Sequence, residues 1–477
     1  ILTQQYAHRM YKGGISYIYN SQPKPIEPFK NWKTQNAWLA LIKEFNFTPL
    51  PNLVSIRAEV DRRFTKTQLR NSELTTDGIE PLFEKYFWFN RFYDLGWNLT
   101  KNSVLSYNSV ANSIIDEPEG EIDSEMKKDS IWGNFRRLGR IKNFDQRIKL
   151  TYRLPLDKLP LTDWMKADYT HEVGYSYQAN AFGLRDSNGA LFGDIIRNKR
   201  EIGITGQVDF VMLYNKLRYL KFANSPSEAS KNFARSPGDI EDISSNSPGI
   251  VKDLTRLLMT VRGINVSYSQ LETTALPGYL DAPEYFGVNN NNIGKLLPFV
   301  LGQQDRSFQR KAAANNWITN SIQQNQPFQQ TIQRIFTANT TLEPIRDLRL
   351  QIEIRKTRQD AYQEFFRPDS LGKPFTSQNP LRNGQFSMSF MSFRTAFAKA
   401  RSDNSSPVFE KFKAYRHTMV RRLNEENPDQ EGTYQLNSQD VLLAAFFAAY
   451  SGKDTATVST NPFLKFPMPN WKLDYNG

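Results

Sequence analysis

A long run of two-residue alternation places the strongest constraint on this chain. In residues 166–182, KADYTHEVGYSYQANAF, every second position from Ala167 is largely apolar, and the positions between are polar apart from Gly174. A period of two predicts a β-strand with one apolar and one polar face. The roughly sixteen alternating residues would span about 50 Å, whereas strands in globular proteins most often have about 5–6 residues.

The same alternation recurs along the chain. Its clearest further examples lie at residues 54–61, 148–154, 201–212, 263–269, 336–343, 348–355 and 386–390. Weaker examples lie near 15–19, 41–48, 86–100 and 104–113. We therefore expect about twelve strands, and no βαβ spacing separates them, so a parallel sheet is disfavoured.

The predicted connections alternate between short and long. Short turns are expected at residues 48–53, 100–104, 155–163 and 342–348, and long loops at 65–85, 116–145, 182–200 and 271–331. This alternation is typical of outer-membrane barrels, which have short periplasmic turns and longer extracellular loops. One insert, at about 221–250, is rich in Ser, Pro, Asn and Asp, and we expect it to be disordered and periplasmic.

Residues 401–460 change from a period of two to helical spacing. Val408, Phe412, Tyr415 and Met419 share one stripe, and a second segment begins with a capping-type Ser438. Two amphipathic helices do not fit a barrel wall. We therefore expect a small helical extramembrane insertion, placed outside the membrane over a pore mouth, and a return toward the next strand over 461–477.

The sequence predicts no catalytic, cofactor-binding or metal-binding residues. The three histidines, His8, His171 and His417, are far apart, and no nucleophile elbow, P-loop, HExxH or GxGxxG motif occurs. The chain has no cysteine, so it has no thiolate site. The carboxylate pairs lie in loop-like stretches, where we expect solvated charges: Glu117 with Glu121, and Asp239 with Asp242.

Composition agrees with a membrane barrel better than with a nucleic-acid-binding protein. The net charge is +12, but Lys and Arg are dispersed and form no basic stripe. No apolar run reaches the ~18 residues of a membrane-spanning helix, whereas membrane strands need only ~9–11. Aromatic residues make up 13% and several lie near predicted strand ends, as in an interfacial girdle. We therefore predict an all-β transmembrane antiparallel barrel over residues 1–400, with the odd-numbered face of 167–181 toward lipid and the other toward an aqueous lumen.

Several segments resemble the SprA/Sov family, the outer-membrane translocon of the type IX secretion system. They are GGISYIYNSQPKPIEPFK, LPLDKLPLTDWMKADYTHEVGYSYQ, GDIIRNKREIGITGQVDFVMLYNKLRYL, RLLMTVRGINVSYSQ, LPGYL, LGQQD, LEPIRDLRLQIEIRKTR and FSMSFMSFRTAF. These segments span nearly the whole chain in the family's order. Because family members are far longer, the resemblance implies that this chain corresponds to an internal piece of a very large single-chain barrel.

The resemblance also implies a function. Members of this family export folded proteins that carry C-terminal secretion signals, and the system is linked to gliding motility. They work with a lateral-gate barrel of the PorV type and a periplasmic plug protein, in the outer membrane of Bacteroidetes-like Gram-negative bacteria. Three alternatives stay open on the residues alone: a passive porin, a plugged nutrient receptor, and a soluble or surface-anchored β-rich carbohydrate-binding protein or hydrolase.

Overall fold

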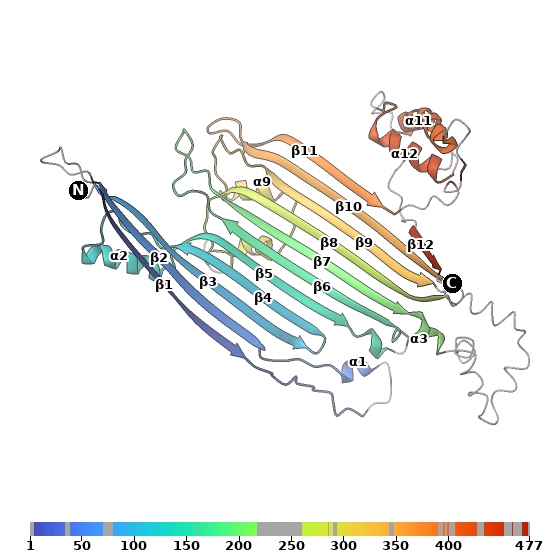
Figure 1. Cartoon of the computed structure of the whole chain (residues 1–477), viewed down its shortest axis with the longest axis horizontal. Helices are drawn as coiled ribbons and strands as arrows, with labels where there is room; N and C mark the ends of the chain where they lie inside the picture. Colours follow the sequence, from blue (N-terminus) through green and yellow to red (C-terminus); the bar gives the residue numbers. More distant parts are fainter. Residues whose placement is uncertain are drawn as a thin grey trace, which may run out of the picture. The chain divides into compact units, whose positions relative to one another are not determined.

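One antiparallel sheet of twelve strands dominates the computed structural model (Figure 1). Strands β1 to β11 pair in sequence order, and β12 pairs with β10. The all-β prediction is therefore confirmed. The structure describes residues 4–33, 39–69, 80–159, 161–216, 260–284, 286–289, 293–342, 348–389, 395, 398–399, 406–426, 434–452, 460 and 470–475.

The strands are long, and the helices lie in the connections between them. The strands are β1 (Gln4–Asn20), β2 (Leu53–Leu69), β3 (Leu82–Thr100), β4 (Ser103–Ile114), β5 (Arg140–Leu154), β6 (Met165–Gln178), β7 (Asp194–Asp209), β8 (Val261–Tyr279), β9 (Phe328–Leu342), β10 (Leu348–Pro368), β11 (Phe375–Met388) and β12 (Asn470–Tyr475). The helices are α1 (Ala40–Lys43), α2 (Glu125–Arg136), η2 (Leu156–Lys158), α3 (Phe210–Tyr214), α8 (Ile293–Val300), α9 (Phe308–Ala314), α11 (Pro407–Glu426) and α12 (Gln439–Tyr450).

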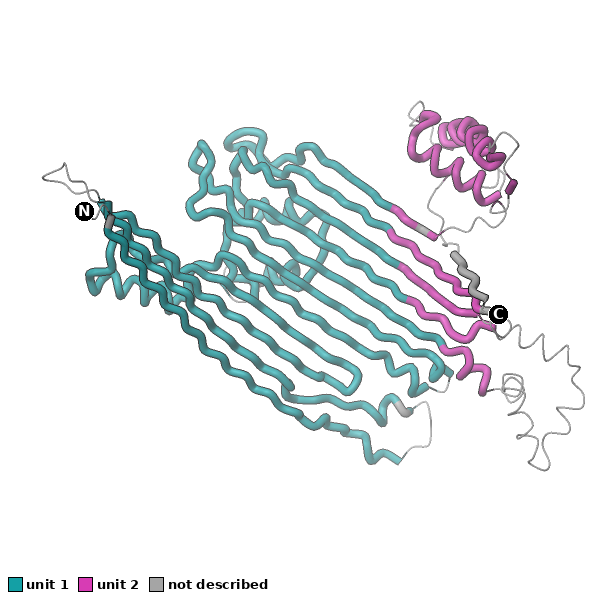
Figure 2. The backbone as a smooth tube through the Cα atoms, in the orientation of Figure 1, with its two compact units in different colours: residues 1–208, 267–335, 358–385 teal, residues 209–266, 336–357, 386–477 magenta. Residues whose placement is uncertain are grey.

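The chain divides into two compact units, coloured separately in Figure 2. The first unit comprises residues 1–208, 267–335 and 358–385. The second comprises residues 209–266, 336–357 and 386–477.

The strand that carries the longest alternation is confirmed as β6. Tyr175 pairs with Gln146 of β5 and with Asn198 of β7, so one phase of the alternation continues across neighbouring strands. The strand ends at Gln178, three residues before the predicted end. It ends there because the backbone N–H of Asn180 bonds to the Asp194 carboxylate at 2.8 Å and leaves the ladder.

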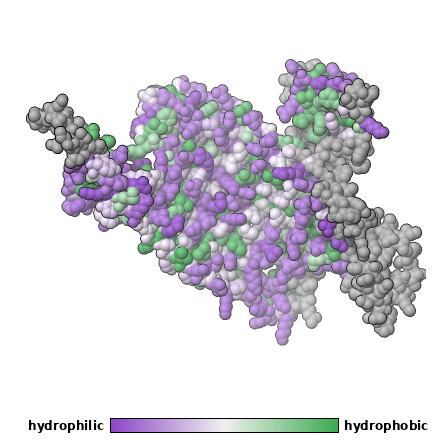
Figure 3. Space-filling model, in the orientation of Figure 1, coloured by the Kyte–Doolittle hydropathy of each residue, from purple (hydrophilic) through white to green (hydrophobic). Residues whose placement is uncertain are grey.

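In the first unit, the register of the strands places apolar residues on one face of the sheet and polar residues on the other. One cross-strand row of the apolar face runs through Val54, Leu95, Tyr107, Ile148 and Val173. The adjacent row, on the polar face, runs through Ser55, Asp94, Asn108, Arg147, Gly174 and Lys199. Figure 3 views the molecule from the side opposite α8 and α9, and hydrophilic side chains predominate there.

The connection from β1 to β2 differs from the prediction. The expected strand at 41–48 is instead the short helix α1 followed by one isolated bridge, Ile26 with Phe47, so residues 48–53 do not join two strands. Pro23, Pro25 and Pro28 precede this region and lack the N–H group that a ladder needs. The turn at 100–104 and the long connections predicted at 116–145, 182–200 and 271–331 are found, although the flanking strands extend into each of these three connections. At the predicted loop 65–85, residues 65–69 and 82–85 are strand instead. The insert at about 221–250 lies outside the described residues.

The main core of the first unit lies on the apolar face of the sheet. Residues 280–327, which contain α8 and α9 and which we call the cover segment, pack on β4 to β10 there. A smaller core forms where α2 packs on β2 and β3, through Ile131, Phe89 and Ile115. Both coverings belong to the predicted long loops, which therefore fold back onto the apolar face.

In the second unit, two helices form a small core of their own. Met419 and Leu423 of α11 pack against Val441, Ala444 and Ala448 of α12, which confirms the predicted helical insertion. β11 and β12 both lie against β10: Ser389 N–H bonds to the carbonyl oxygen of Arg355, and β12 pairs with Leu348–Glu353. In the sequence, the two helices thus lie between β11 and β12, which both pair with β10. The predicted position outside the membrane stays a prediction.

Candidate functional site

The three histidines have separate local surroundings. His8 of β1 contacts the Thr65 hydroxyl at 3.0 Å, His171 of β6 contacts the Tyr169 hydroxyl at 3.3 Å, and His417 lies exposed on α11. Among the described residues, no group of His, Cys, Asp or Glu side chains could hold a metal ion. None of the described helices combines the length and the apolar character needed to cross a membrane.

The carboxylates of the loop before α2 are not all solvated, contrary to the prediction. Glu117 is ion-paired with Arg62 of β2 at 2.6 Å, and its side chain is only 3% exposed. Glu121 pairs with Lys66 at 3.0 Å but is 48% exposed. Sequence alone missed this tether because the partners lie 55 positions away. Asp239 and Asp242 lie outside the described residues.

Two amide side chains, the buried Asn198 and the half-buried Gln304, hold the cover segment on the sheet. Asn198 of β7 donates through Nδ2 to the carbonyl oxygens of Phe299 and Gln303, at 3.0 Å each. Gln304 donates to Asn198 Oδ1 at 3.1 Å, and the Thr274 hydroxyl of β8 donates to Gln304 Oε1 at 2.8 Å. Each member of this network satisfies another, as buried polar groups must. The motif LGQQD, residues 301–305, thus serves to dock the cover.

A second set of contacts holds the far side of the cover segment. Gln309 of α9 donates to the Glu364 carboxylate of β10 at 2.6 Å. Asp305 is ion-paired with Lys311 at 2.5 Å and accepts the N–H of Ser307 at 2.8 Å. The Lys311 ammonium, which donates to this carboxylate, holds the pKa of Asp305 below its ordinary value of 3.8.

Close backbone approach explains the glycines of two motifs. Gly302 has φ of +80°, and a Cβ there would lie 3.0 Å from Val173 Cγ1. Gly278, in the motif LPGYL, has φ of +79°, and a Cβ would lie 2.8 Å from Thr319. Positive φ costs little only for glycine, so both positions favour that residue.

The cover segment corrects the prediction for the odd-numbered face of β6. Tyr175 is 2% exposed, and its ring meets Phe299 edge-on with 6.2 Å between ring centroids. Val173 and Tyr177 are buried as well. Tyr175 and Val173 therefore contact the chain's own loop and not lipid, and Tyr177 belongs to the buried core that this loop covers. The alternation specified which face is apolar, but it could not specify what covers that face.

A signal for this covering was present in the sequence. Polar residues interrupt the apolar phase of two neighbouring strands: Asn198 and Arg200 in β7, and Glu272 and Thr274 in β8. Arg200 donates through Nε to Glu272 at 2.9 Å. Such residues are costly on a lipid-facing surface and need polar partners. They indicated a docked segment.

Toward the short turns, the apolar face of the first unit is open. One row there runs through Trp97, Leu105, Leu150, His171 and Ile202, and the next through Tyr152, Tyr169 and Ile204. Ile204 is 45% exposed. Within the described part of the first unit, neither α2 nor the cover segment packs on these rows. We call them the open band.

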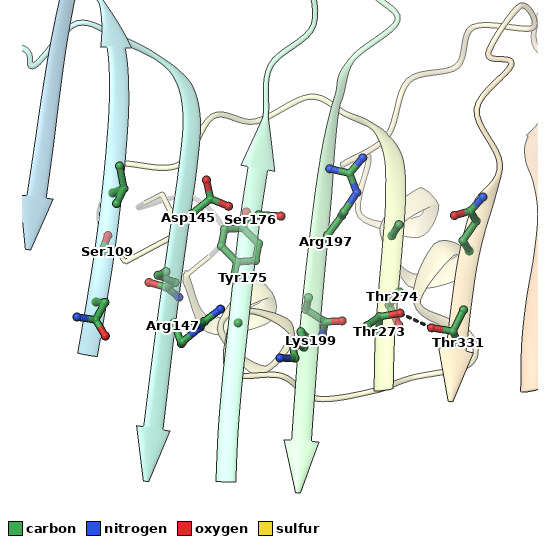
Figure 4. A pocket seen from close by; sticks show the side chains of 17 residues that line it. Ser109, Asp145, Arg147, Tyr175, Ser176, Arg197, Lys199, Thr273, Thr274 and Thr331 are labelled. Carbon is green, nitrogen blue, oxygen red and sulfur yellow. Dashed lines mark hydrogen bonds between the residues drawn. The ribbon is translucent and has the colours of Figure 1, made fainter. Parts of the chain in front are cut away.

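The polar face carries a hollow of about 640 Å³ (Figure 4). Gly174 of β6 is one of the residues that line it and has no side chain. Arg147 and Lys199 border it and bind Glu172 from either side, at 3.3 and 3.1 Å. Thr273 and Thr331 complete the border with a hydrogen bond of 2.5 Å. A polar ligand in this hollow could form hydrogen bonds with threonine hydroxyls and with basic side chains whose charges are already paired with Glu172.

No family model matches this chain, and no curated protein matches it significantly.

Proposed function

We propose that the sheet forms part of the wall of a transmembrane β-barrel in an outer membrane, and that the barrel conducts protein. The observation that carries this proposal is the pair of opposite exposed faces on the same strands. Ile204 and Thr205 are neighbours on β7 and are both exposed, yet one belongs to the apolar face and the other to the polar face. An open apolar face is stable in lipid, while a polar face requires water.

Strand length supports the same proposal. A membrane strand needs about 9–11 residues when tilted. β3 has 19 residues, and α2 packs on it through Phe87 and Phe89. Residues 91–100, which follow, suffice for one crossing. The remainder of the strand would project beyond the bilayer, where the cover segment and α2 shield its apolar side from water.

The resemblance to the SprA/Sov family supports the protein-conducting part of the proposal. A translocon needs a wide hydrated lumen and no catalytic residue, and lumen width grows with strand number. Twelve strands in this chain alone would then belong to a large barrel. Folded cargo with C-terminal secretion signals, a lateral-gate barrel of the PorV type and a periplasmic plug protein are the partners that this proposal implies.

Extraction and secretion assays test the two parts separately. If the chain is a barrel wall, detergent releases it from membranes, while alkaline carbonate and high salt do not. If the barrel conducts protein, its loss abolishes export of proteins with C-terminal signals and leaves small-solute uptake unchanged. Loss of solute uptake with normal protein export would instead identify a porin or nutrient receptor.

The hollow around Gly174 favours a second candidate, a soluble or surface-anchored β-rich carbohydrate-binding protein or hydrolase. Its hydroxyl and amide lining suits a sugar. This candidate predicts a chain that is released without detergent and a saturable heat of binding with oligosaccharides. A detergent-dependent chain that binds no sugar would exclude it.

A further inference from the structure

Besides Leu280 at its start, which is 41% exposed, three large apolar side chains of the cover segment remain exposed. Phe286 is 65% exposed, Leu301 is 49% and Leu297 is 36%. By contrast, Leu296 and Phe299 of the same stretch are buried in the core. The segment is therefore apolar on its inner side and also along one outer edge, which water alone does not favour. We call Phe286, Leu297 and Leu301 the rim.

The rim lies where the cover segment meets the open band. The Phe286 ring lies 5.8 Å from the ring of Tyr107, measured between centroids. Leu301 precedes Gly302, whose backbone lies against Val173. Tyr107 and Val173 are members of one cross-strand row of the apolar face, joined through Ile148. The next row toward the short turns is the first row of the open band.

The backbone at Phe286 is unusual as well. Its φ is +50°, a left-handed conformation that costs energy for a residue other than glycine. Such conformations persist where the surroundings require them, and here the conformation accompanies a ring that projects beside Tyr107. The backbone conformation of the loop thus holds the Phe286 ring in its exposed position.

The second covering of the same face offers a parallel. Trp132 of α2 is 60% exposed, although Ile131 beside it is buried. Lys127 and Lys128 lie on the same helix. Tryptophan combined with lysine is typical of residues at a membrane interface. The two segments that cover this face, although independent in sequence, thus each expose a large apolar side chain.

We propose that the rim inserts among the acyl chains of the outer leaflet, so that the cover segment is anchored in lipid. This proposal rests on the proposed function, in which the open band contacts lipid. At β5 and β6 the rim continues the apolar surface of the band, through Ile148, Leu150 and Val173. At β7 and β8 the ion pair of Arg200 with Glu272 lies at the end of the row that contains Val173. Lipid is therefore the occupant that both surfaces share.

Introduced cysteines allow a direct test, because the chain has none of its own. Phe286→Cys and Leu301→Cys are labelled separately with bimane in the full chain. The labelled chains are reconstituted in phosphatidylcholine–phosphatidylglycerol vesicles, with or without lipids that carry a nitroxide high on the acyl chain. Ile204→Cys reports the open band. Phe182→Cys, an exposed aromatic position in the loop after β6, is the matched control away from the rim.

The expected result is nitroxide quenching at positions 286 and 301 similar to that at 204, and little quenching at 182. Quenching at 204 without quenching at 286 and 301 would overturn the rim proposal and leave the barrel proposal intact. Equal quenching at 182 and at the rim would overturn it as well. No quenching at any position would overturn both proposals.

Discussion

Asn198 and Phe299 lie 101 positions apart in the chain and share a hydrogen bond of 3.0 Å between the Asn198 amide and the Phe299 carbonyl oxygen. Asn198 is buried, and the same amide also donates to Gln303. This one side chain therefore joins β7 to the cover segment. Burial of the apolar face thus depends on contacts between segments that are distant in the sequence.

Replacing Asn198 by Ala should loosen the cover segment. The change removes the three hydrogen bonds that the Asn198 side chain makes to Phe299, Gln303 and Gln304, and each such bond contributes about 0.5–1.5 kcal/mol. Hydrogen exchange should increase over residues 293–314 and stay unchanged in β5 and β6. Gln207→Ala, an exposed amide on the same strand, is the control and should change neither region. Equal protection of the cover in both variants would contradict the docking role.

Gly302→Ala should destabilise the cover more than Gly189→Ala does. Both glycines have positive φ, +80° and +83°, so both substitutions carry a backbone penalty of about 1–2 kcal/mol. Only position 302 adds a contact, with Val173, because nothing lies within 4 Å of a Cβ at 189. Denaturant unfolding of the two variants measures the difference. Adding Val173→Ala to Gly302→Ala should recover part of the loss, and no recovery would show that the contact is unimportant.

An arginine at Ile204 should be far worse than an arginine at Thr205. If Ile204 contacts lipid near the midplane, Ile204→Arg costs about 2–4 kcal/mol, whereas Thr205→Arg lies in water. The measurement is the fraction of chain that folds into membranes. Both positions are exposed, so a soluble protein would tolerate both changes equally. Equal folding of the two variants would therefore argue against a barrel wall.

The Asp305–Lys311 pair should make the cover segment sensitive to acid. The pKa of Asp305 is lower in the folded chain than its ordinary value of 3.8, so its stabilisation is fully present above that value. It is lost as the pH falls through the folded pKa. Asp305→Asn should therefore lower the unfolding midpoint at pH 7 but not well below the folded pKa. An equal deficit at both pH values would assign the effect to shape and not to charge.

Glu117→Gln should release α2 from β2, and Glu121→Gln should not. Glu117 is buried beside Arg62, and a hydrogen bond to a charged group of this kind contributes about 1.5–3 kcal/mol. The exposed pair of Glu121 with Lys66 contributes about 0–1 kcal/mol. Protease cleavage within 116–139 reports the release. Cleavage that increases equally in both variants would show that burial of Glu117 is irrelevant.

The strands of the sheet could be predicted from local sequence patterns. Alternation with a period of two defined β2, β5, β6, β7, β8 and β10, because side-chain direction in a strand depends only on position along it. The helical spacing of α11 and α12 was equally local. The weak alternation at 41–48 predicted a strand that does not form, and the prolines before α1 lie outside that segment.

Which parts of the apolar face are covered depends on contacts between segments that are distant in the sequence. Tyr175 and Ile204 have the same side-chain direction and the same kind of local pattern, yet one is buried and the other is 45% exposed. The difference comes from residues about a hundred positions later, through Phe299, Gln304 and Gly302. Periodicity reports which way a side chain points, whereas burial depends on what the rest of the chain brings to that side.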